Sequence, residues 1–220
     1  MFDTFFTILI EYAPVFLEGA IITLLYATIT VVCGSIIGGL LSIIKLSNNK
    51  IINCIINGYV SIIRGTPLLV QLYIFYYGIP LVTGIDIMKE ASIAIALIIN
   101  SSAYITEIIR SGIQAVDKGQ TEAARSLGMS NINTMKKIIL PQAIKNILPA
   151  LGNEFISVVK ETSLAAILFG GDLMTSFTTV KSITFKTLEP LFIIGIIYFI
   201  LNYILSKLVN RLERKMALSD

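Results

Sequence analysis

The stretch that decides the fold is EAARSLGMSNINTMKKIILP, residues 122–141, a charged segment between two strongly apolar ones. Thr121 is suited to cap a helix beginning at Glu122, because its hydroxyl can accept a hydrogen bond from the first-turn amides. Gly128 ends or turns that helix, and Ser130–Asn133 offers a second cap. The pattern predicts a short helix lying across a membrane face. Its tip is made of small residues, Ala123, Ala124 and Gly128.

Such a small tip with flanking charges suits docking into the groove of a partner protein. The alternative is an ordinary solvated loop at the membrane interface. The rest of the chain must therefore indicate which of the two applies.

The composition is that of an integral membrane protein. The chain has 220 residues, is 55% hydrophobic and has a mean hydropathy of +0.83, whereas a soluble domain needs a polar surface. A net charge of only +3 does not favour nucleic acid as a partner. The absence of histidine excludes histidine catalysis and histidine metal sites, and no phosphate-binding loop of the Walker type occurs. We therefore expect no catalytic residue, no metal site and no cofactor bound by this chain.

The apolar stretches predict an all-α membrane domain over residues 1–220 with five transmembrane helices. The sequence RGTP at 64–67 breaks the second stretch, so we expect a helix up to about Ile63 and a span after the break. The polar segment 170–190 is predicted to be a broken external connection. The expected spans are residues 16–44, 67–82, 91–113, 144–169 and 191–208, with a cytosolic coupling loop at 118–141.

Basic residues predict the orientation, because they accumulate on the cytosolic side of membrane proteins. No Lys or Arg precedes Lys45, whereas many surround the quoted segment and follow the fifth span. The N-terminus is therefore expected outside the cell, and the quoted segment and the C-terminus in the cytosol. In the first span, Gly34 and Gly38 form a small-xxx-small pair that favours close helix packing. The two cysteines, Cys33 and Cys54, are interpreted as small packing residues.

The spacing within the quoted segment is specific. Glu-Ala-Ala, three residues, Gly, nine residues, Ile, one residue and Leu-Pro resembles the loop that permease subunits of ABC importers insert into their ATPase subunits. Three further segments are similar to the polar amino-acid branch of that family: RGTPLLVQL (64–72), SAYITEIIRSGI (102–113) and GNEFISVVKETSL (152–164). The resemblance covers residues 18 to 214 and implies the type I ABC importer permease fold.

The resemblance also implies a set of partners in a prokaryotic cell membrane. These are a second permease subunit, expected to be an identical copy, a dimer of ATPase subunits that binds ATP and Mg²⁺, and an extracytoplasmic amino-acid-binding protein. Coupling to the ATPase is expected through Glu122, Ala123, Ala124, Arg125 and Gly128. Without that loop pattern, a secondary transporter or channel would be the alternative.

Ionisable residues at bilayer depth are candidates for a substrate site. Glu154 and Glu161 are seven residues apart and therefore nearly on one helical face, with Ser157 and Val158 between them on or near that face. Lys160 lies about a quarter turn away from Glu161. The face predicts a cavity with two carboxylates, although Lys160 and Glu161 could instead pair with neighbouring helices.

Further candidate cavity residues are Asn100, Ser101, Tyr104, Thr66 and Gln71. Arg64 either serves a ligand carboxylate or anchors the chain at the interface, and Glu107 with Arg110 is interpreted as a structural pair. Two carboxylates favour a cationic amino acid such as arginine, lysine or histidine. Alternatively, Glu154 holds the α-ammonium group common to all amino acids, in which case glutamine or another polar amino acid fits equally well.

Overall fold

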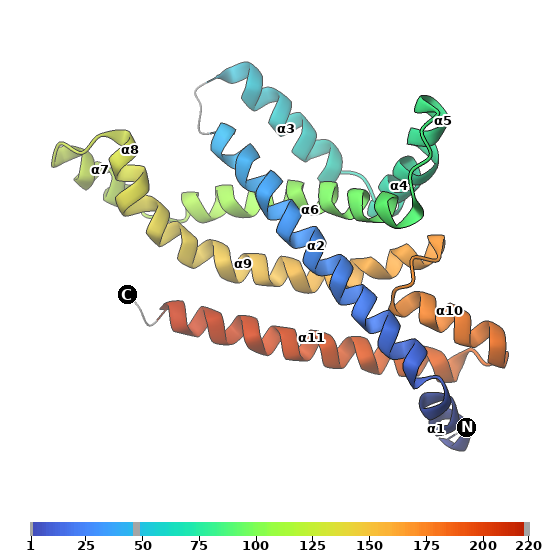
Figure 1. The fold of residues 1–220 in the computed structure, drawn as a ribbon. Coiled ribbons are helices and arrows are strands. Elements are labelled where there is room, and N and C mark those ends of the chain that lie inside the picture. Colours follow the sequence, from blue (N-terminus) through green and yellow to red (C-terminus); the bar gives the residue numbers. More distant parts are fainter. Residues whose placement is uncertain (1, 46–48, 218–220) are drawn as a thin grey trace.

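The structure is a computed structural model that describes residues 2–45 and 49–217, and helices dominate it (Figure 1). The first half comprises α1 (Phe2–Glu11), α2 (Ala13–Lys45), α3 (Lys50–Arg64), α4 (Leu68–Tyr73), the π-helical turn η1 (Ile74–Gly78), α5 (Ile79–Thr83) and α6 (Lys89–Gln114). The second half comprises α7 (Lys118–Ser126), α8 (Asn131–Thr134), the π-helical turn η2 (Met135–Ile139), α9 (Leu140–Glu161), the 3₁₀ segment η3 (Thr162–Leu168), α10 (Leu173–Thr184) and α11 (Leu188–Ala217).

Among the described residues, three helices are long and apolar enough to cross a membrane: Ala13–Lys45, Lys89–Gln114 and Leu188–Met216. Two bent pairs raise the number to five if each counts as one span. Lys50–Arg64 and Leu68–Thr83 meet at 102°, and Asn131–Leu168 and Leu173–Thr184 meet at 43°. The predicted break at RGTP is confirmed as the sharper of these bends.

Close packing of α2 on α6 organises the bundle (Figure 1). A Cβ atom on Gly38 would lie 2.8 Å from the carbonyl oxygen of Ser102, so only glycine allows this approach. Next to it, the Ser42 hydroxyl donates to the carbonyl of Thr106 across the interface at 3.2 Å. The small-residue pair predicted in the first span thus brings two long helices into contact.

α9 lies between α6 and α11, with α2 crossing over it (Figure 1). Gly112 of α6 receives Ile147 of α9, and Gly152 of α9 receives Val209 of α11. α7 and α8 lie at one end of α9, and α11 ends on that same side, whereas α1 and α10 lie at the opposite side (Figure 1). The quoted segment and the basic end of α11 therefore share one side of the molecule.

Two sequence expectations are corrected by the fold. The segment 170–190 is not simply a broken connection, because it contains the helix α10. Leu173 and Val180 of α10 are fully buried against α1, α2 and α11, and this packing stabilises the helix. The helix was not predicted because its many threonines and serines are typical of a loop. In addition, α7 begins at Lys118, and its cap is Asp117 rather than Thr121, because the Asp117 carboxylate accepts from the Gly119 amide at 2.7 Å.

Candidate functional site

Two predicted site residues meet halfway along α6. The Ser101 hydroxyl donates to Oε1 of Glu154 in α9 at 2.8 Å, and Ser101 is buried while Glu154 is partly buried. Ser101 is near the middle of the 26 residues of α6, so this contact lies near the middle of a helix long enough to span a membrane. No Lys or Arg side chain in residues 2–45 and 49–217 forms an ion pair with Glu154.

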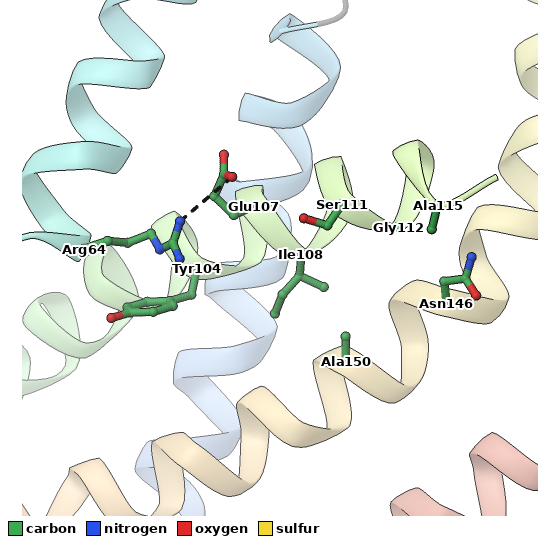
Figure 2. A pocket seen from close by; sticks show the side chains of 9 residues that line it. All are labelled: Arg64, Tyr104, Glu107, Ile108, Ser111, Gly112, Ala115, Asn146 and Ala150. Carbon is green, nitrogen blue, oxygen red and sulfur yellow. Dashed lines mark ion pairs between the residues drawn. The ribbon is translucent and has the colours of Figure 1, made fainter. Parts of the chain in front are cut away.

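A hollow of about 380 Å³ opens between the second half of α6 and the first half of α9 (Figure 2). Tyr104 and Ile108 of α6 and Ala150 of α9 line it, and Arg64 reaches over from the end of α3 (Figure 2). The Arg64 guanidinium lies 5.1 Å from the centre of the Tyr104 ring, a cation–π distance. Tyr104 and Arg64 therefore belong to one cavity wall.

Glu107 lines the same wall, and three basic side chains from three helices lie within 4 Å of its carboxylate. Arg110 is closest, with Nη2 at 2.7 Å, and Lys45 of α2 follows at 3.4 Å. Arg64 of α3 is only at 3.9 Å, and its side chain is 42% exposed (Figure 2). The predicted pairing of Glu107 with Arg110 is confirmed. Because one carboxylate balances one charge, Arg64 contributes positive charge to the cavity.

Thr66, Gln71 and Asn100 form a separate network that holds the bend between α3 and α4. The Gln71 amide donates to the carbonyl of Ile63 at 2.8 Å and to the Thr66 hydroxyl at 3.0 Å, and its oxygen accepts from Asn100 at 3.0 Å. A helix break leaves backbone carbonyls without partners; Thr66 and Gln71 donate to those of Ile62 and Ile63, and Asn100 holds the Gln71 side chain in place. Direct contact of these three residues with a substrate stays a prediction.

Glu161 and Ser157 lie further along α9, where they line an open hollow of about 390 Å³ with Lys160, Ser163 and Leu164. Val158 does not share this face, because it is buried with Ala27 of α2. Glu154 does not line this hollow, so the predicted cavity with both carboxylates stays a prediction, and Val158, placed on or near that face by its spacing, belongs to the core. Among the described residues no metal-binding cluster of carboxylates and cysteines occurs.

The predicted coupling segment forms a helix and a tight turn. Ala124 is buried under the turn, and its carbonyl accepts from the Met129 amide at 3.1 Å. Gly128 has φ +81°, a conformation that favours glycine, and a Cβ there would meet no atom of this chain within 4 Å. Arg125 donates to the carbonyl of Met129 at 2.6 Å, so it clamps the turn from within.

Glu122 and Ala123 face solvent as the sequence led us to expect. The sequence reasoning overlooked Leu127, which is 85% exposed at the tip of the same turn. Leu127 could have been predicted from the sequence, because it directly precedes Gly128. A residue between the end of a helix and such a turn points its side chain outward. The segment therefore presents an apolar tip on an ordered turn.

Comparisons with known proteins agree with this arrangement. Residues 31–218 match the family described as binding-protein-dependent transport system inner membrane component. The arginine transport system permease protein ArtQ of Bacillus subtilis is 41% identical over 98% of this chain and 98% of its own length. The putative glutamine transport system permease protein GlnP of Rickettsia felis is 42% identical over 97% of this chain and 100% of its own length.

Among solved structures, an amino acid ABC transporter crystallised with histidines matches with a TM-score of 0.92 and 45% identity, over 94% of this chain and 96% of that one. The MetNI methionine ABC transporter, at 18% identity and a TM-score of 0.78, shares the fold. The chain therefore belongs to the family of inner membrane components of binding-protein-dependent transport systems, as a permease subunit of an amino-acid ABC transporter.

Proposed function

We propose that this permease carries cationic amino acids, such as arginine, lysine or histidine, and that Glu154 is the main contact for the cationic side chain. The observation that carries the proposal is a carboxylate at mid-depth with a hydroxyl partner, Ser101, and no cation paired with it in the described part of the chain. An ionised carboxylate removed from water is costly unless a cation meets it. A guanidinium does so with two parallel hydrogen bonds.

Two charged side chains suggest an orientation for the substrate. One is the Glu154 carboxylate of α9, and the other is Arg64, the weakly held cation beside Glu107, which lines the hollow at the Tyr104 end. A zwitterion with a cationic side chain complements this order, with its side chain toward Glu154 and its α-carboxylate toward Arg64. Ser157 and Glu161, in the neighbouring hollow, would meet the substrate before or after this position.

The subunit does no covalent chemistry, because ATP hydrolysis belongs to a separate subunit of such transporters. We propose that a dimer of ATPase subunits, carrying ATP and Mg²⁺, docks on the segment 118–141 at Glu122, Ala123 and Gly128, on a turn that Ala124 and Arg125 hold in shape. A second, identical permease subunit completes the membrane part, and an extracytoplasmic binding protein delivers the substrate. The N-terminus then lies outside and the C-terminus in the cytosol of a prokaryotic cell.

A second candidate is a neutral substrate such as glutamine. In that case Glu154 holds the α-ammonium group of any amino acid, and the side chain needs no charge. The observation in its favour is that relatives of nearly equal similarity are named for arginine and for glutamine. The two candidates differ in what Glu154 recognises.

The substitution Glu154→Gln tests this difference, because it removes the charge and keeps the shape. We expect arginine binding to the purified complex with its ATPase to fall about tenfold or more, the equivalent of about 1.4 kcal/mol, while glutamine binding holds or improves. Ser101→Ala is the matched control, since it removes the hydrogen bond and keeps the charge. Equal losses for arginine and glutamine in Glu154→Gln would instead identify an α-ammonium clamp.

A further inference from the structure

Another hollow, of about 270 Å³, opens between the last turn of α2 and the end of α6. It is here called the α2–α6 pocket, and its lining residues are Ser42, Lys45, Arg110, Ile113 and Gln114. None of these residues lines the hollow between α6 and α9 or the one beside Glu161. Both α2 and α6 end toward the side where α7 and α8 lie (Figure 1). The α2–α6 pocket is therefore distinct from the substrate site described above.

The α2–α6 pocket carries more positive charge than the neighbouring acid balances. Nζ of Lys45 lies 3.4 Å from Oε1 of Glu107, and Nη2 of Arg110 lies 2.7 Å from Oε2 of the same carboxylate. One carboxylate balances only one of these two charges, and Arg64 lies near the same carboxylate at 3.9 Å. In the part of the chain that the structure describes, no other acid pairs with Lys45 or Arg110. A net positive charge therefore remains at the pocket.

Hydrogen-bond donors accompany this charge. Arg110 donates through Nε to Glu107 at 2.8 Å and through Nη1 to Oε1 of Gln114 at 2.5 Å. A guanidinium and an ammonium carry more N–H groups than these contacts use, so Arg110 and Lys45 both keep donors for a further acceptor. Because Gln114 accepts with its oxygen, its amide nitrogen keeps its own donors. Positive charge together with several N–H donors suits an anionic oxygen group such as a phosphate.

The surroundings of the pocket favour a lipid over a soluble anion. Leu40 and Ile43, on α2 just before Lys45, are 56% and 65% exposed. Arg110 follows Ser101, near the middle of α6, by nine residues, which is about 13 Å along the helix axis. The half-thickness of a bilayer core is about 15 Å, so Arg110 lies close to the level at which lipid headgroups begin. Phosphate groups and apolar chains are both available there.

We propose that the α2–α6 pocket binds the headgroup phosphate of an anionic phospholipid, with Lys45 and Arg110 as the charged contacts and Gln114 as a hydrogen-bond donor. Basic pockets between membrane helices on the cytosolic side are known sites for such headgroups. Because the contacts come from two helices, the bound lipid joins the ends of α2 and α6. The site does not depend on the proposed substrate, and only its assignment to the cytosolic leaflet rests on the proposed orientation of the chain.

Lipid binding to the purified complex with its ATPase, measured by native mass spectrometry, tests the site. Phosphatidylglycerol is compared with phosphatidylcholine of the same acyl chains, and we expect the complex to retain the anionic lipid preferentially. Lys45→Gln should weaken phosphatidylglycerol binding about fivefold, the contribution of one basic residue near a membrane surface. Lys50→Gln is the matched control, because Lys50 is an exposed lysine at the start of α3 that does not line the pocket. Equal losses in the two variants would indicate general surface attraction and overturn the proposed site.

A second variant tests the pocket without touching the ion pairs of Glu107. Gln114→Leu keeps both positive charges and removes the amide donors, so phosphatidylglycerol binding should again fall about fivefold. Binding at the parent level in Gln114→Leu would contradict the proposed contact.

Inorganic phosphate identifies the source of the anion. It lacks acyl chains and should not displace the bound lipid at millimolar concentration, whereas displacement would replace the lipid by a soluble anion. Equal retention of phosphatidylglycerol and phosphatidylcholine by the parent complex would overturn the preference for an anionic lipid. None of these measurements uses an amino acid, so they are interpretable whatever Glu154→Gln shows.

Discussion

Replacing Gly128 by Asp should uncouple transport without unfolding the permease. Gly128 has φ +81°, and a Cβ there would meet open space in this chain. The intrinsic cost is therefore only that of a left-handed conformation, about 1 kcal/mol, and Asp and Asn tolerate it better than other residues. If Gly128 lies against an ATPase subunit, however, any side chain intrudes on that contact.

The chain offers a closely matched control in Gly84. It ends α5 with φ +70°, a Cβ there would also meet no atom within 4 Å, and it lies outside the segment 118–141. Gly84→Asp therefore carries the same conformational cost and the same charge. Any difference between Gly84→Asp and Gly128→Asp reports on contacts outside this chain.

The assay is ATP-driven amino-acid uptake into vesicles, with the amount of ATPase that co-purifies with the permease as a second readout. We expect Gly128→Asp to lose at least tenfold more uptake than Gly84→Asp and to retain less ATPase. Gly128→Asn separates size from charge, because it has the same shape as Asp and should uncouple as well. Equal uptake in Gly84→Asp and Gly128→Asp would refute the docking assignment.

Three further predictions concern the isolated subunit and its packing. Purified without its partner, the permease should hydrolyse no ATP, and hydrolysis that follows this chain alone would contradict the assignment of ATPase activity to another subunit. Gly38→Leu should destabilise the complex by about 1–3 kcal/mol in thermal unfolding, because its Cβ would lie 2.8 Å from the Ser102 carbonyl, whereas Gly39→Leu, which meets nothing within 4 Å, should be nearly neutral. Gln71→Leu should cost about 1–3 kcal/mol, since it strips the Asn100 amide and the helix break of hydrogen-bond partners; unchanged stability would show that water replaces the amide.

Much of the fold was predictable because its causes are local or compositional. A mean hydropathy of +0.83 requires lipid around most of the chain, and RGTP breaks a helix wherever it stands. The turn at Gly128 follows from the glycine itself, which accepts φ +81° without strain. The motif in residues 122–141 needed no tertiary information for the same reason, since a single short segment carries all its positions.

The site was less predictable because it is assembled from side chains far apart in the sequence. Periodicity grouped Glu154 with Glu161, but it could not reveal that Ser101 hydrogen-bonds to Glu154. Nor could it show that Gln71 and Asn100 pair with each other at the helix break. Each of these partners belongs to a different helix, and helix packing alone decides which of them meet.

The sequence by itself determined that this chain is a helical membrane subunit with a tight turn at Gly128, because composition, glycine and proline act over a few residues. Only the tertiary structure decided which charged side chains are left without a close partner of opposite charge. Glu107 neutralises itself with Arg110 and Lys45 and leaves Arg64 weakly held, and the packing of α6, α11 and α2 around α9 leaves Lys160 facing outward. A charge is balanced by whatever lies within a few ångströms of it, and in a folded chain that distance bears no relation to separation in the sequence.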